Sequence, residues 1–303
     1  MTTAPELTAT PELTATPELA PTPELPATAW ALSPSRALDF KTCALLYRFR
    51  VIDGLTEPPS LDAARGTVVH GILERLFDLP AAARTPAAAD GLVEPQWREL
   101  LAADEELAAL VDGATDGLVA LLDSTRALLA SYFTLEDPRR LEPADREVLV
   151  ETTLPSGVRL KGFVDRLDRA GDGRVRVVDY KTGKSPREEF EGKALFQLRF
   201  YALVLWRSAG VLPTMLRLYY LADREVLDYH PDEADLCALE RQVEALGAAI
   251  LRARESGDWR HKPSKLCDWC SFQSLCPAFG GTPPPLPTTE PPLPGQGEVS
   301  TSI

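Results

Sequence analysis

The chain has 303 residues, a formal net charge of −13 and five cysteines. This length allows one large domain or two small ones, because domains typically span about 100 to 200 residues. The acidic charge argues against a protein that coats nucleic acid nonspecifically, since phosphate binding usually requires a basic surface. No apolar run approaches the roughly 20 residues of a membrane span, and the start of the chain lacks a basic, apolar leader. We therefore expect a cytoplasmic protein without a membrane-spanning segment.

Both ends have the composition of disordered segments. The tripeptide PEL recurs at 5–7, 11–13, 17–19 and 23–25, and the end of the chain is rich in proline. Such segments contain too little apolar surface to offset the entropy lost on ordering. We expect a disordered arm over 1–28, one folded domain over 29–279 and a disordered Pro-rich tail over 280–303.

The first half of the folded part is predicted to be mostly helical. Ser33 suits the N-cap and Pro34 the first turn of a helix that carries Cys43 near its end. A second helix is predicted over about 61–77, followed by a loop over 78–91. Helical segments from about 94 to 133 then follow, with a break at Gly113.

The hydrophobic period changes to two in the next stretch. EVLVETTLP, GVRLKGFVDRLDRA and RVRVVDYKTG are separated by the turn sequences PSG and GDG, which predicts a three-stranded antiparallel meander. A helix over about 188–208 that ends at Gly210, two further strands and a helix over about 232–256 complete the pattern. The whole favours an α/β fold, a mixed sheet with flanking helices.

Two aspartates in the meander are candidates for binding a metal ion. Asp165 and Asp179 lie on adjacent predicted strands, and two carboxylates held close together need a cation or a proton. Mg²⁺ or Mn²⁺ would satisfy this need, because hard ions take oxygen ligands. Lys181 shares a strand face with Asp179 and would hold or deprotonate a nucleophilic water. The alternative is a surface ion pair at a strand end, which contributes little.

Two predicted helices offer further candidates. His70 follows Gly66 by one helical turn, and the missing side chain would let a backbone or substrate approach closely. Gln197 and Tyr201 share one face of their helix, where the amide needs a partner such as Lys181 or a DNA phosphate. The alternatives are a histidine without a ligand role and a polar residue at the edge of an apolar stripe.

Three other carboxylates of the meander are expected to lie outside the site. Glu151 could join a metal shell through water, but a solvent-facing position in its strand is favoured. Asp168 and Asp172 are predicted to be solvated turn residues, since turns favour aspartate.

The cysteines have the spacing of a metal centre. Cys267, Cys270 and Cys276 supply three thiolates, and Cys43 is the candidate for the fourth. Four thiolates complete either a zinc site or a 4Fe–4S cluster, and both remain open on ligand type alone. Cys237 lies in a Leu/Ala-rich helical pattern and is predicted to be a small core residue.

Taken together, these motifs resemble the RecB-family exonucleases, a branch of the PD-(D/E)XK nuclease superfamily that includes the AddB nuclease domain and the CRISPR adaptation nucleases. The family motifs GxxxH, GxxD, DxK and QxxxY occur in this order as Gly66…His70, Gly162…Asp165, Asp179-Tyr180-Lys181 and Gln197…Tyr201. Iron–sulfur members of the family add one cysteine before these motifs and a C-x2-C-x5-C triplet after them, a pattern that is also present here.

The resemblance implies a PD-(D/E)XK core and a role for each matching residue. The divalent ion, Mg²⁺ or Mn²⁺, would be bound by His70, Asp165, Asp179 and the Tyr180 carbonyl. Lys181 would be the catalytic lysine, and Gln197 and Tyr201 would position it and the nucleic-acid backbone. The 4Fe–4S cluster would be held by Cys43, Cys267, Cys270 and Cys276.

The function expected on this basis is metal-dependent hydrolysis of DNA, by an exonuclease acting on single-stranded ends in DNA repair or recombination. The alternative is a non-catalytic DNA-binding or scaffold subunit of a helicase–nuclease complex. The sequence contains no Walker A phosphate-binding loop, so unwinding would require a helicase partner. Residues 159–199 carry eleven Lys/Arg against seven Asp/Glu, which gives the expected site a local basic surface despite the acidic chain.

Overall fold

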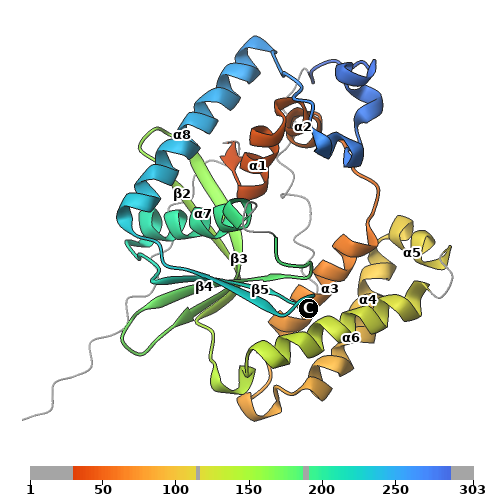
Figure 1. The fold of residues 1–303 in the computed structure, drawn as a ribbon, viewed down its shortest axis with the longest axis vertical. Coiled ribbons are helices and arrows are strands. Elements are labelled where there is room, and N and C mark those ends of the chain that lie inside the picture. Colours follow the sequence, from red (N-terminus) through yellow and green to blue (C-terminus); the bar gives the residue numbers. More distant parts are fainter. Residues whose placement is uncertain (1–29, 114–116, 187–190, 288–303) are drawn as a thin grey trace, which may run out of the picture.

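The computed structural model describes residues 30–113, 117–186 and 191–287 (Figure 1). The expected N-terminal arm lies outside the described residues, and so does the chain after 287. The described part of the predicted tail contacts the domain: the Gly281 N–H donates to the Cys276 carbonyl at 3.0 Å, and the Arg48 guanidinium donates to the Pro284 carbonyl. The described fold therefore continues past Phe279 to residue 287.

A mixed sheet forms the centre of the molecule, as predicted. Its strands are β1 (Ala31–Leu32), β2 (Asp145–Thr153), β3 (Arg159–Arg169), β4 (Val175–Lys181), β5 (Met215–Tyr220) and β6 (Glu225–Tyr229). The predicted antiparallel meander is β2–β3–β4, β5 lies parallel to β4, and β6 is antiparallel to β5. The short β1 pairs in parallel with the start of β3.

Helices cover both faces of this sheet (Figure 1). One face carries α1 (Pro34–Thr42), α7 (Glu191–Ala209) and α8 (Glu233–Ser256), and the other carries α3 (Leu61–Leu76), α4 (Pro86–Ala103), α5 (Glu105–Asp112) and α6 (Gly117–Leu135). Each layer has its own core: Val177 and Phe200 lie in the first, and Val178 and Trp97 in the second. Adjacent residues of β4 thus enter different cores, because side chains alternate along a strand.

Two predicted segments differ from the structure near the start of the chain. Cys43 has an extended backbone (φ −161°, ψ 119°) between α1 and α2 (Ala44–Tyr47), which continues as a π-helical turn, Arg48–Ile52. The prediction of one continuous helix through Cys43 is therefore wrong. The second half of the predicted loop over 78–91 is the first turn of α4, where the Thr85 hydroxyl accepts from the Ala88 N–H. Thr85 followed by Pro86 is an N-terminal helix signal that outweighs the alanine- and proline-rich composition.

Asp168 is also not where the sequence predicted it. Strand β3 extends to Arg169, so that Asp168 lies inside the β3–β4 pairing rather than in the turn. Its carboxylate lies 3.0 Å from Arg166 and 2.7 Å from Arg176. Asp172 does lie in the exposed turn, where it accepts from the Arg174 N–H at 3.2 Å. Glu151 is half-buried and lies 3.6 Å from Arg159, away from the other candidate residues.

In the described ranges, one helix is long and apolar enough to cross a membrane by length and composition alone, namely α6. The apolar residues of α6 are explained by its packing inside the domain. The Trp97 indole of α4 donates to the Thr125 hydroxyl at 3.0 Å inside the second core. The exposed side carries Arg126, which pairs with Asp90 and Glu94. Helix α6 packs as a layer helix of the domain.

Candidate active site

Asp179 and Lys181 lie on the same face of β4 and meet a polar face of α7. The Lys181 ammonium is 2.6 Å from Asp179 Oδ2 and donates to Gln197 Oε1 at 2.9 Å. The Gln197 amide donates to Asp179 Oδ1 at 3.0 Å and to the Tyr201 hydroxyl at 2.8 Å. The Asp179 side chain is only 1% exposed, so a surface ion pair does not describe this contact. The amide orients both charged groups, because each contacts a different end of it.

Asp165 and His70 approach Tyr180 from two other elements. The Tyr180 N–H donates to Asp165 Oδ2 at 2.8 Å, which fixes the carboxylate of β3 against β4. Helix α3 brings His70 to the same place: its Nδ1 lies 3.3 Å from Asp165 Oδ2 and its Nε2 lies 2.9 Å from the Tyr180 carbonyl oxygen. The four predicted ligand groups thus converge from α3, β3 and β4.

One residue of this cluster was not predicted. Glu147 of β2 forms a group with His70 and Asp165 in which the ligand atoms all lie within 4.8 Å of one another. The β2–β3 register places Glu147 opposite Asp165, between the pairs Arg146↔Arg166 and Val148↔Val164. Counting back from the PSG turn would have revealed this position, since the turn sets the register.

At Glu147 in β2 and Asp165 in β3, the regular alternation of side chains between the two sides of the sheet is interrupted. Val148 and Val164 contribute to the core on the α7 side. Two residues away, Arg166 donates to the Tyr180 hydroxyl on the other side of the sheet at 2.6 Å. Glu147 has a left-handed backbone with φ +42°, which is uncommon for a residue other than glycine. Such conformations cluster at functional sites, because the surrounding structure must hold them.

The cluster contains more carboxylate groups than cationic groups. Burial and the charge of Asp165 together raise the pKa of Asp179 to about 6, against the opposing effect of Lys181. Burial, with the charge of Asp165, also raises the pKa of Glu147 to about 7. For His70, burial lowers the pKa, but the hydrogen bond and charge of Asp165 outweigh it and bring the pKa to about 9. An additional positive charge at this place would relieve the repulsion among the carboxylates.

The donor set fits a hard divalent ion. It offers carboxylate oxygens, a backbone carbonyl and one imidazole, which are the ligand types of Mg²⁺ and Mn²⁺ sites. Asp179 Oδ2 is buried and, although Lys181 is close, accepts no hydrogen bond of good geometry. The site opens into a cleft of about 540 Å³ whose lining includes His70, Asp165, Asp179, Lys181, Lys184 and Gln197. A substrate therefore has access to the cluster.

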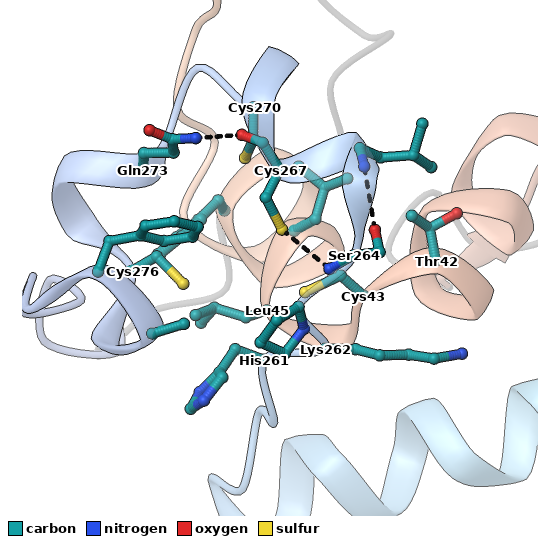
Figure 2. A pocket seen from close by; sticks show the side chains of 16 residues that line it. Thr42, Cys43, Leu45, His261, Lys262, Ser264, Cys267, Cys270, Gln273 and Cys276 are labelled. Atoms are coloured by element: carbon teal, nitrogen blue, oxygen red, sulfur yellow. Dashed lines mark hydrogen bonds between the residues drawn. The ribbon is translucent and has the colours of Figure 1, made fainter.

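Four of the five cysteines line a second cavity, of about 50 Å³ (Figure 2). Figure 2 shows Cys43 at the junction of α1 and α2 beside Cys267, Cys270 and Cys276. Burial raises the pKa of the Cys270 thiol, and the other three cysteines raise it further. The Ser264 N–H donates to Cys267 Sγ at 3.3 Å. The extended backbone of Cys43 thus brings together the predicted set, which Cys237 on α8 does not join.

Comparison with known proteins agrees with this geometry. Residues 31–277 match the family model of the PD-(D/E)XK nuclease superfamily. The chain belongs to this superfamily. The crystal structure of a "Putative exonuclease" from Eubacterium rectale has the same fold, with a TM-score of 0.54, 16% identity and coverage of 79% of this chain and 86% of that one.

Curated relatives match this chain over shorter stretches. The "Gene 69 protein" of Mycobacterium phage L5 is 30% identical over 126 residues, 41% of either chain. One subunit of the "ATP-dependent helicase/deoxyribonuclease" of Streptococcus equi subsp. zooepidemicus is 28% identical over 156 residues, which is 50% of this chain and 14% of that one. The chain thus spans less than half the length of these relatives.

Proposed function

We propose that this protein is a metal-dependent exonuclease that hydrolyses the phosphodiester bonds of single-stranded DNA ends in repair or recombination in the cytoplasm. The observation that carries the proposal is the convergence of His70, Asp165, Asp179 and the Tyr180 carbonyl beside Lys181 in an open cleft. A buried carboxylate beside a lysine, next to further groups that can bind a metal ion, suits hydrolysis at phosphorus.

The residues divide into ligands and groups that handle the nucleophile. His70, Asp165, Asp179 and the Tyr180 carbonyl would hold the ion, with Glu147 as an additional carboxylate. A bound Mg²⁺ or Mn²⁺ would polarise the phosphate and lower the pKa of a bound water. The Lys181 ammonium, fixed by Asp179 and Gln197, would orient that water and offset the charge that develops on phosphorus.

A contact between Tyr201 and Gly162 supports the arrangement of Gln197 and Lys181. The Tyr201 hydroxyl accepts from Gln197, and its ring lies against Gly162. A Cβ on Gly162 would lie 2.5 Å from Tyr201 Cε1, so that only glycine lets the ring reach this position. Tyr201 is therefore a positioning residue for Gln197, and through it for Lys181.

DNA as the substrate is supported by one relative. The matching protein of Streptococcus equi subsp. zooepidemicus carries deoxyribonuclease in its name. The same name suggests a helicase partner for this chain, whose own sequence lacks a Walker A loop. A non-catalytic scaffold protein is the second candidate, but such a scaffold has no need to keep the ligands, the lysine and its amide partner in one cleft.

We also propose that Cys43, Cys267, Cys270 and Cys276 hold a 4Fe–4S cluster. A tetrahedral zinc ion with Zn–S distances of about 2.3 Å places its sulfurs about 3.8 Å apart. Among the residues that the structure describes, no three cysteine sulfurs lie within 4.8 Å of one another. The wider spacing around a cavity favours a larger cluster over a single ion. All four cysteines are free of disulfide bonds, the state in which thiols persist in a reducing cytoplasm.

The decisive experiment for the nuclease is a cleavage assay on end-labelled linear and circular single strands with Mg²⁺, Mn²⁺ or EDTA. We expect cleavage of linear DNA only, mononucleotide or short products, and no activity with EDTA. Lys181→Ala serves as the matched inactive control. Metal-independent cleavage, or none by the wild-type protein under any condition, would refute the proposal, and cleavage of circles would show an endonuclease instead.

A further inference from the structure

The β2–β3 face beyond the active site carries an exposed apolar pair. Leu149 and Phe163 lie directly opposite each other in the register and are 49% and 52% exposed. Their neighbours Val150 and Val164 face the core on the α7 side, so the pair points to the opposite side of the sheet. Large apolar side chains exposed in contact with each other indicate a binding surface more often than isolated ones do.

The helical layer leaves this part of the sheet open. Over β4 the same side of the sheet is covered, since Val178 and Tyr180 belong to the second core. On β2, helix α3 reaches Arg146, which donates to the Glu74 carbonyl, and His70 reaches Glu147. The pair begins two residues further along each strand, immediately beyond that cover.

The pair also lies next to the candidate ligands. Phe163 precedes Asp165 by two residues in β3, and Leu149 follows Glu147 by two residues in β2. Two residues of a strand advance about 7 Å, a step comparable to one nucleotide of an extended single strand. A base next to a phosphate at the ligand cluster would therefore reach the ring of Phe163.

Positive charge follows at the next step along the same face. Lys161 precedes Phe163 by two residues and lies opposite Glu151. Burial lowers the pKa of Lys161. Arg159, two residues earlier in β3, lies 3.6 Å from Glu151, which places two cations beside one carboxylate here. Carboxylates, an aromatic ring and cations thus follow one another along β3.

We propose that Leu149 and Phe163 form a stacking surface for the nucleobase adjacent to the scissile phosphate of a single DNA strand, and that Lys161 contacts a neighbouring phosphate. The inference rests on the proposed nuclease function. A single strand is the occupant that fits, because its bases are free to stack on an aromatic ring whereas those of a duplex are stacked inside it. The flanking cations match its phosphates, and the ligand cluster at one end matches the phosphate to be cleaved.

The test uses the full-length wild-type protein and single-stranded oligonucleotides that carry one abasic nucleotide, placed at successive positions from either end. We expect the wild-type protein to lose about tenfold in kcat/KM for the first cleavage when the abasic position falls beside the scissile bond. Phe163→Ala should lose a similar factor on the intact strand, mainly in KM, because stacking is present before and during the reaction.

The abasic substitution should then cost Phe163→Ala nothing further, since the stacking partner is already absent. Phe163→Trp should retain the wild-type pattern, and Phe163→Leu should not. Leu251→Ala, an exposed leucine on α8 with 45% exposure, is the matched control for Leu149→Ala and should leave kcat/KM unchanged. Lys161→Ala should reduce the slope of log kcat/KM against log salt by about 0.7.

The outcomes separate the two proposals. No metal-dependent cleavage by the wild-type protein on any strand overturns the nuclease function and this inference with it. Cleavage that responds equally to the abasic position in wild type and Phe163→Ala overturns the stacking surface alone. Cleavage that is unchanged in both Phe163→Ala and Leu149→Ala does the same, and shows that the pair faces solvent or a protein.

Discussion

The ring of Tyr201 occupies the space that a side chain at Gly162 would need. Their contact joins α7 to β3, and the Tyr201 hydroxyl extends it to Gln197. Gly162→Ala should therefore destabilise the domain by about 1 to 3 kcal/mol, the range for overpacking a core, and should lower kcat by displacing Gln197. Urea unfolding and single-turnover cleavage measure the two effects. In a double mutant with Tyr201→Ala the alanine at 162 should cost much less, and full additivity would contradict the contact.

Asp179→Asn and Lys181→Ala should abolish cleavage while the fold is retained. Each loses several orders of magnitude in rate, because the ion or the group that handles the water is lost. Asp179→Asn should not destabilise the metal-free protein at pH 7. The folded-state pKa of about 6 exceeds the usual 3.8, so the charged carboxylate opposes folding at neutral pH.

Circular dichroism and thermal unfolding check the fold of these two variants, and the control is Asp172→Asn in the exposed turn, which should cleave normally. Activity within a few-fold of wild type in either active-site variant would remove Asp179 and Lys181 from the mechanism.

His70→Ala should lose activity and regain part of it at raised Mn²⁺. A missing ligand weakens the site, and mass action refills it at a higher concentration of the ion. Glu147→Gln should raise the Mn²⁺ concentration for half-maximal activity by about 10-fold, the effect expected of a group that supports the ligands. Titration of metal-free protein by calorimetry gives the same comparison without activity. If His70→Ala loses stability and its activity does not depend on the Mn²⁺ concentration, His70 is a core residue instead of a ligand.

The motif spacing predicted which of these side chains lie together, because residues that are close in the sequence have their relative placement set by the strand or helix that carries them. Asp179 and Lys181 had to share a face two residues apart, and Gln197 and Tyr201 had to share a helical turn. Glu147 was missed for a different reason. Its place depends on the register between two strands, which the PSG turn sets, and its left-handed backbone has no local signal in the sequence.

The same limit applied to two other features of the fold. Nothing local in the sequence showed that the helix would break at Cys43, where the extended backbone brings the thiol to the distant cysteine triplet. The buried ion pair between Arg166 and Glu136 was also not predicted. Arg166, only 1% exposed, contacts Glu136 at 2.7 Å, and the Tyr219 hydroxyl donates to Glu136 at 2.7 Å. Such pairs form between segments that meet only in the folded state.

The Glu136–Arg166 pair yields a prediction for stability. Glu136→Gln leaves a buried guanidinium with less compensation and should cost about 3 kcal/mol at pH 7, whereas Asp172→Asn in the exposed turn should leave the unfolding free energy unchanged. Although burial favours the protonated form, Arg166 outweighs it and lowers the pKa of Glu136 below its usual 4.5.

The sign of the pH dependence follows from that lowered pKa. The carboxylate stabilises the fold above its unfolded pKa, and this contribution is lost as the pH falls through the lower folded value. Wild-type stability in urea should therefore fall below about pH 4.5 more steeply than that of Glu136→Gln. Equal slopes for the two proteins would contradict the role given to the pair.

The cysteine cavity predicts a metal centre whose role is structural. Cys43 precedes the nuclease motifs and the triplet follows them, so a cluster that joins them closes a loop of more than two hundred residues. By analogy with a disulfide, closing so long a loop removes unfolded-state entropy worth about 5 kcal/mol. Replacing Cys43, Cys267, Cys270 or Cys276 by serine should give colourless protein that is unstable or insoluble.

Cys237→Ser is the matched control for these variants and should keep both colour and fold, because Cys237 lies on α8 outside the cavity. Protein purified without oxygen should contain about four irons per chain and show charge-transfer absorption in the visible range. Activity should fall only as far as the fold is lost, since the ligand cluster of the nuclease is separate from the cysteines. Stoichiometric zinc without iron, or colour that persists in Cys43→Ser, would show that the four thiolates hold something other than this cluster.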